Sequence, residues 1–73
     1  MYIATYIHNQ DLGRVYLYDT FEDALKQAHA MAVDLLDRNL SKSELLDLDE
    51  IGTVFIEQDH DNCFTFCIGV VEE

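Results

Sequence analysis

The residue types best suited to metal binding gather at residues 57–63. Asp59, His60 and Asp61 are consecutive, with Glu57 before them and Cys63 after them, and all of these side chains can bind divalent ions. A metal site needs three or four side chains that converge on one point, whereas neighbours in a tight turn point outward. The segment therefore predicts a solvated hairpin turn, and we expect neither a metal nor another cofactor.

Patterns typical of enzymes are missing from the sequence. It has no glycine-rich phosphate loop, no serine in a Gly-x-Ser-x-Gly turn, and no recognisable pairing of Cys with His. Carboxylates are abundant, but general acid–base catalysis needs a pocket that separates their pKa values, and 73 residues enclose little volume for one. We therefore expect a protein without enzymatic activity.

Charge is the most unusual property of the chain. Fifteen Asp and Glu residues against four Lys and Arg residues leave a formal net charge of −11, while 49% of residues are hydrophobic, which excludes a disordered acidic tail. A field of this sign repels nucleic-acid phosphates and anionic membranes and attracts basic surfaces. The expected partner is a basic protein, with no direct contact to nucleic acid or membrane.

Many of the carboxylates fall in the helical part of the sequence. Their spacing of about 5–6 Å on a helix surface can imitate a line of phosphates, although a solvating face is the alternative interpretation. The candidate partner-binding residues are Asp23, Asp34, Asp37, Glu44, Asp47, Asp49 and Glu50.

A helix is predicted over residues 20–40, because apolar residues recur there at steps of three and four. Thr20 is its expected cap, with Asp23 three residues on, and Asn39 is the expected stop. Ser41 and Glu44 form a second capping box that begins a short helix over residues 42–49, with Leu45, Leu46 and Leu48 facing inward. The apolar positions of the long helix are Phe21, Ala24, Leu25, Ala28, Ala32, Leu35 and Leu36.

Two hairpins flank these helices. Residues 2–8 alternate with a period of two, residues 9–13 suit a five-residue loop closed by Gly13, and residues 14–18 form the returning strand, with Tyr6 expected opposite Tyr16. One face carries aliphatic residues, which we expect to pack on the alanine-rich helix, and the other carries tyrosines, which we expect to point away from it. The aliphatic residues are Ile3, Ile7, Val15 and Leu17, and the possible dimer or contact face is Tyr2, Tyr6, Tyr16 and Tyr18.

Residues 53–58 and 63–71 complete the expected sheet. In the last strand Cys63 and Cys67 share one face about 13 Å apart, too far to pair, and are interpreted as small hydrophobic side chains in a reducing compartment. The prediction is a single α+β domain spanning residues 1–73, in the order β-β-α-α-β-β: a four-stranded antiparallel sheet with one long helix and a short second helix on one face. No signal segment or membrane span is recognisable, so we expect a cytoplasmic protein.

A small, strongly acidic domain built as strands around one helix, without a catalytic motif, resembles in kind the anti-restriction and anti-CRISPR inhibitors of bacteriophages. The resemblance covers size, charge and layout and carries no individual residue over to this chain. It implies a protein that binds and blocks a basic, nucleic-acid-binding surface of an effector in the host cytoplasm. The alternative expectation is a homodimeric structural or regulatory module that joins through its tyrosine face or a sheet edge.

Overall fold

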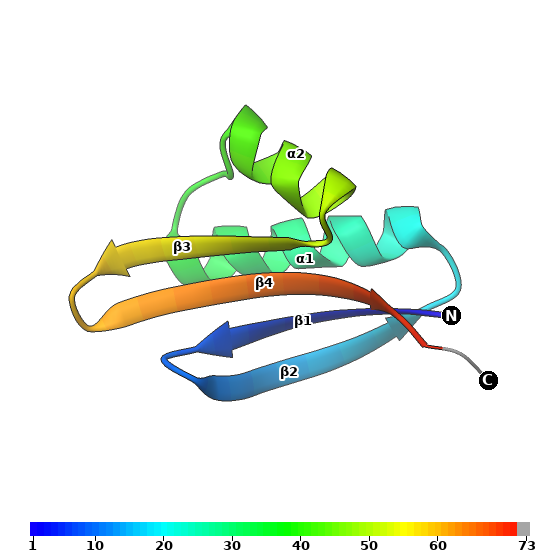
Figure 1. The fold of residues 1–73 in the computed structure, drawn as a ribbon, viewed down its shortest axis with the longest axis horizontal. Coiled ribbons are helices and arrows are strands. Elements are labelled where there is room, and N and C mark those ends of the chain that lie inside the picture. The colour runs from blue at the N-terminus through cyan, green and yellow to red at the C-terminus, as the bar shows by residue number, and fades with distance from the viewer. Residues whose placement is uncertain (72–73) are drawn as a thin grey trace.

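The structure, a computed structural model that describes residues 1–71, has the expected α+β fold (Figure 1). All strand pairs are antiparallel, and the sheet order β2-β1-β4-β3 makes the first and last strands the central pair. The predicted element order is confirmed. The elements are β1 (Tyr2–His8), β2 (Asp11–Tyr18), α1 (Phe21–Leu36), α2 (Lys42–Glu50), β3 (Thr53–Asp59) and β4 (Asn62–Val70).

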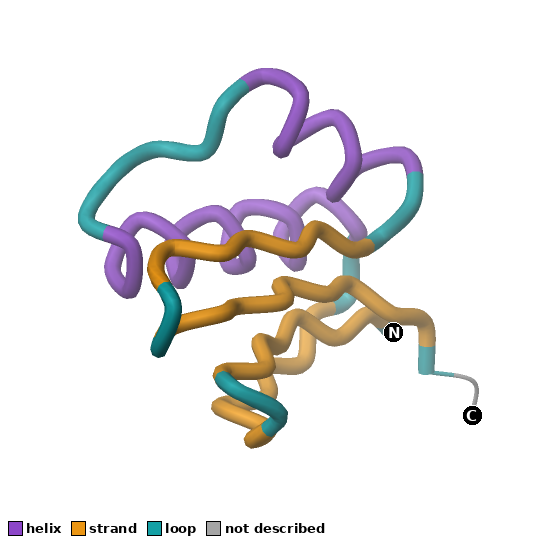
Figure 2. Tube along the Cα trace, turned by 60° about the vertical axis from the view of Figure 1, so that its left-hand side comes forward, coloured by secondary structure: helices purple, strands orange, loops and turns teal. Residues whose placement is uncertain are grey.

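Both helices lie on the same side of the sheet, which gives the molecule two layers (Figure 2). Helix α1 packs across β1, β4 and β2, while α2 packs over the edge strand β3. We call the helix side the inner face of the sheet and the opposite side the outer face. Within residues 1–71, no element covers the outer face.

The helix starts follow the predicted caps. The Thr20 hydroxyl accepts a hydrogen bond from the Asp23 amide at 3.2 Å, and Ser41 and Glu44 form a reciprocal capping box. The end of α1 differs from the prediction, because Asp37 adopts a left-handed conformation (φ 57°) and stops the helix at Leu36. The chain then turns early enough for Leu40 to enter the core at 6% exposure.

The core lies between the helices and the inner face. A ridge of small residues on α1 meets large side chains from the central and edge strands, and Leu48 brings α2 onto the same core. The predicted inward role of Leu46 is wrong: its side chain is 52% exposed, while Leu45 is half-buried. The buried apolar residues are Ala4, Ala24, Ala28, Met31, Ala32, Leu36, Leu40, Leu48, Val54, Ile56, Phe64 and Phe66.

The two faces of the first hairpin are oriented opposite to the prediction. The four tyrosines pack against the core, with Tyr2 edge-on to Phe21 of α1 at 5.8 Å between ring centroids. Val15 and Leu17, expected against the helix, are 50% and 60% exposed. The alanine ridge of α1 leaves space that large rings fill better than aliphatic chains, and a phenol keeps its hydroxyl at the rim.

The turn of this hairpin is shorter than predicted. Asn9 and Gln10 both take positive φ (49° and 73°) and form a two-residue connection instead of the expected five-residue loop. Tyr16 consequently pairs with Ala4 rather than Tyr6, and a register shift follows between Thr5 and Ile7. Gly13 does not close the turn. It lies within β2 under the Tyr6 ring, which a Cβ at this position would overlap.

Candidate interaction surfaces

Most of the predicted partner-binding carboxylates lie exposed on the helical layer. Asp23 is in the first turn of α1, where a carboxylate favours the positive end of the helix dipole. The other positions form two groups at opposite ends of the helical layer, one where α1 ends and one where α2 ends (Figure 1). The exposed members of the predicted set are Asp23, Asp34, Asp37, Asp47, Asp49 and Glu50.

The carboxylates at the helix ends oppose the helix dipoles. The last turn of α1, residues 33–36, contains Asp34 and no basic residue, and Asp37 follows directly. The last turn of α2, residues 47–50, likewise contains acidic residues and no basic one. A negative charge beside a helix C-terminus costs about 0.3–1 kcal/mol, so these positions carry acidic groups at the expense of stability.

Glu44, the seventh predicted position, already has partners within the chain. Its carboxylate accepts two hydrogen bonds from the Arg38 guanidinium, at 3.0 and 3.1 Å, and one from the Ser41 amide at 2.8 Å. These contacts lower the pKa of Glu44 from its ordinary value of 4.5 to about 2, with the Arg38 hydrogen bond as the largest cause. Glu44 therefore holds the connection between α1 and the start of α2.

The segment with the most metal-like composition forms a tight turn between β3 and β4. The Asp59 carboxylate accepts hydrogen bonds from the Asn62 side chain and the Asp61 amide, and these contacts lower the pKa of Asp59. Among residues 1–71, no three His, Cys, Asp or Glu side chains are grouped so that they could hold a metal ion.

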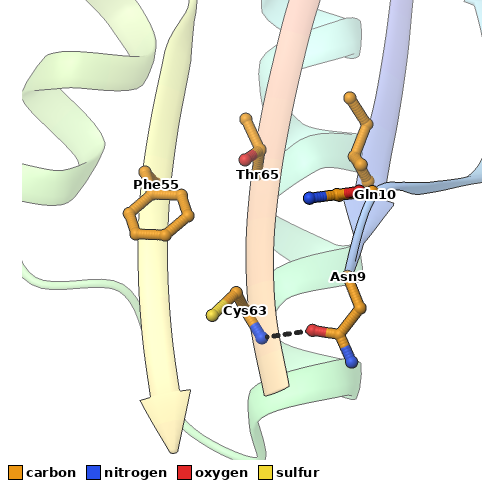
Figure 3. Close-up of a pocket in the computed structure, with 6 residues that line it drawn as sticks. Asn9, Gln10, Phe55, Cys63 and Thr65 are labelled. Carbon is orange, nitrogen blue, oxygen red and sulfur yellow. Dashed lines mark hydrogen bonds between the residues drawn. The ribbon is translucent and has the colours of Figure 1, made fainter. Parts of the chain in front are cut away.

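Asn9 joins the tips of the two hairpins. Its side-chain oxygen accepts a hydrogen bond from the Cys63 amide at 2.9 Å (Figure 3). Its backbone amide donates to the Cys63 carbonyl at 3.0 Å, and its side-chain nitrogen donates to the Asp61 carbonyl. The neighbouring His8 ring stacks on Phe64 at 4.4 Å and hydrogen-bonds to Asn62. Side chains therefore hold the tips of the two hairpins together in addition to the strand ladder.

The outer face of the sheet carries exposed apolar side chains that the sequence did not predict to lie on an uncovered surface. Leu12, Leu17 and Phe55 are 66%, 60% and 64% exposed, respectively, and lie on the two edge strands. Between the edges, the central strand β4 presents small side chains. The apolar and small side chains of the outer face are Ile3, Thr5, Ile7, Leu12, Val15, Leu17, Phe55, Cys63, Thr65 and Cys67.

A hollow of about 390 Å³ opens on this face between β3 and β1. Figure 3 shows Phe55 on one side of it, Cys63 and Thr65 along its floor, and Asn9 and Gln10 at its other side. The hollow exists because the β4 side chains are smaller than their neighbours. Both cysteines are free, as expected, and both are half-buried on the outer face.

The tyrosines lie on the inner face instead. Their rings contact the core, and the uncovered surface of the first hairpin is the aliphatic one. The tyrosines were expected to form a contact surface because they were predicted to lie on the uncovered face, and they do not lie there. These residues are Tyr2, Tyr6, Tyr16 and Tyr18. The alternation of side chains in the sequence defined the two faces of the hairpin, but both faces are apolar enough to pack against the helix.

Comparisons with protein-family models, with curated proteins and with solved structures found no significant match. In the part of the chain that the structure describes, no helix is long and apolar enough to cross a bilayer.

Proposed function

We propose that this protein is a non-enzymatic, acidic inhibitor that binds a basic, nucleic-acid-binding surface of a target protein. The observation that carries the proposal is the set of exposed carboxylates where α1 and α2 end: Asp34, Asp37, Asp47, Asp49 and Glu50. Each lies in or just after a last turn without a basic residue, where the helix dipole disfavours it. A requirement for negative charge at these places accounts for that cost.

The chemistry of the partner follows from this charge. Lys and Arg side chains that hold phosphates also pair with carboxylates, and opposite fields accelerate the encounter. A phage-encoded anti-CRISPR or anti-restriction protein acting in the host cytoplasm fits this proposal, with a nucleic-acid-binding effector as the target. The acidic protein itself makes no contact with nucleic acid or membrane.

The test is capture of bacterial host proteins from lysate by the immobilised chain, at about 50 mM and about 500 mM salt, with double-stranded DNA as competitor. A captured basic protein should be released by salt and displaced by DNA. Reversing the charge in the quadruple variant Asp34→Lys, Asp37→Lys, Asp47→Lys, Glu50→Lys should abolish capture and leave the fold intact or more stable, because unfavourable dipole contacts and self-repulsion are removed.

The matched control reverses four exposed carboxylates away from the helix ends: Asp11, Asp19, Glu57 and Asp61. Both variants change the net charge equally, so only the position of the charges differs. Capture that survives in the control and is lost in the helix-end variant supports mimicry by the carboxylates at the two helix ends. Equal loss in both shows that bulk charge alone is responsible, and capture that survives in both contradicts the proposal.

A second candidate function is a homodimeric structural or regulatory module without an inhibitory role. The uncovered apolar outer face favours it, because monomeric proteins seldom expose contiguous apolar patches of more than a few hundred Å². Salt separates the two candidates: an apolar interface between acidic copies tightens as salt screens their repulsion, whereas capture of a basic target weakens.

A further inference from the structure

We infer that the outer face of the sheet binds a second copy of this chain, so that two sheets stack face to face. The inference concerns a different surface from the acidic helix ends and does not depend on what those ends bind. It rests on three properties of the outer face: its area, its distribution of charge, and its relief.

The area is sufficient for a specific interface. Four strands of seven to nine residues span about 19 Å by 23–30 Å, or roughly 500 Å² in projection on each copy. Two copies together remove roughly 1,000 Å² of projected area from water. Because side chains roughen the surface, the solvent-accessible area that the two copies bury is larger than this projected area. It reaches about 1,200 Å², the lower limit of specific interfaces.

The charge distribution selects this face for contact between like copies. Two chains of formal charge −11 repel one another, and most of the carboxylates lie on the helical layer or at the hairpin tips. Among residues 1–71, the strand register places one charged residue on the outer face, Glu57, close to the end of β3.

Stacking through the outer faces also keeps the acidic layers apart. Two stacked sheets lie about 10 Å apart, and a helix adds about 10 Å on each side, so the helical layers would be about 30 Å from one another. That distance is more than three times the Debye length of about 8 Å at physiological ionic strength. Self-association through the outer face therefore costs little in repulsion, whereas contact through the helical layers costs much.

The relief of the outer face is self-complementary. Leu12 and Leu17 form a ridge on β2, Phe55 forms another on β3, and the small residues Cys63 and Thr65 leave the hollow between them. A two-fold axis within the interface makes any contact between an edge ridge of one copy and the low β4 strand of the other form twice. The product is a sandwich of two sheets with helices outside, in which the exposed aliphatic residues become core.

The first test is the mass of the wild-type protein by light scattering from one to a few hundred micromolar. A mass of twice the 8.4 kDa chain is expected, with a melting temperature that rises with protein concentration. The dimer should tighten as salt is raised from about 0.01 M, where the Debye length is about 30 Å, to about 0.15 M, where it is about 8 Å. A single-chain mass throughout this range, with a melting temperature independent of concentration, would overturn the inference.

The wild-type cysteines report which face is used. Cys63 and Cys67 both lie on the outer face, so their rate of reaction with a thiol reagent should fall as concentration drives dimer formation. A doubled mass without protection of either thiol would place the contact elsewhere, at a sheet edge or on the helical layer, and would refute the inference.

Variants then locate the interface. Leu17→Lys and, independently, Phe55→Lys should each raise the dissociation constant by about 30-fold or more, because a lysine ammonium would be buried without a partner. Leu46→Lys is the matched control: Leu46 is 52% exposed on α2 and receives the same charge, but lies on the helical layer. Far-UV circular dichroism checks that each variant folds. The inference is contradicted if neither outer-face variant weakens the dimer, or if Leu46→Lys raises the dissociation constant as much as the outer-face variants do.

Discussion

Glu44 makes two contributions to stability that two substitutions separate. Its carboxylate binds the Arg38 guanidinium and also accepts a hydrogen bond from the Ser41 amide at the start of α2. Glu44→Gln keeps a side-chain oxygen for the Ser41 amide but removes the charge, whereas Glu44→Ala removes both. The difference between the two variants isolates the cap from the ion pair.

The geometry sets the size of each effect. The Arg38 side chain is 46% exposed, so solvent screens the ion pair, and Glu44→Gln should cost about 0.3–1 kcal/mol. Losing the cap as well should bring the cost of Glu44→Ala to about 1–2 kcal/mol. For a domain of this size 1 kcal/mol corresponds to about 4–8 °C, so melting temperatures should fall by about 1–8 °C for Glu44→Gln and by about 4–16 °C for Glu44→Ala.

The pH dependence follows from the lowered pKa of Glu44. Because the folded state lowers this pKa from its ordinary value of 4.5 to about 2, the ion pair contributes fully above the ordinary value and is lost as pH falls through the folded value. The gap between wild type and Glu44→Gln should therefore be constant near neutral pH and close between about pH 4 and pH 2. The assay is thermal unfolding by circular dichroism at one protein concentration. No gap at pH 7, or a gap that persists at pH 2, would refute this reasoning.

Two further predictions concern the turn and the core. Gln10 has φ 73°, a conformation that glycine adopts at less cost than glutamine, so Gln10→Gly should raise the free energy of unfolding by about 0.5–1 kcal/mol in urea titrations. The control Gln58→Gly, in strand β3, should lower it by a similar amount. Loss of stability in Gln10→Gly would contradict the turn geometry. Leu36 is 4% exposed, whereas Leu35 is half-buried. Leu36→Ala should therefore lower the free energy of unfolding by about 2–5 kcal/mol, and Leu35→Ala should lower it clearly less. Equal melting temperatures of the two variants would show that the packing of these residues is misassigned.

Local rules in the sequence determined the elements of this protein. Thr20 and the Ser41–Glu44 box mark both helix starts because capping depends on residues only three apart. Alternation with a period of two located the strands and correctly divided β4 into a face with Phe64 and Phe66 and a face with small residues. The α+β order and the antiparallel sheet followed from these elements.

Tertiary packing decided which face of the sheet is covered. Both faces of the first hairpin are apolar, so alternation defines two faces without ranking them, and the fit of large tyrosine rings over the alanine ridge of α1 selects the inner one. The turn was decided in the same way: Asn9 bonds to Cys63, a residue of β4 more than fifty positions away, which holds the two-residue connection. Such long-range contacts leave no local pattern, and for that reason the exposed aliphatic outer face emerged only from the folded structure.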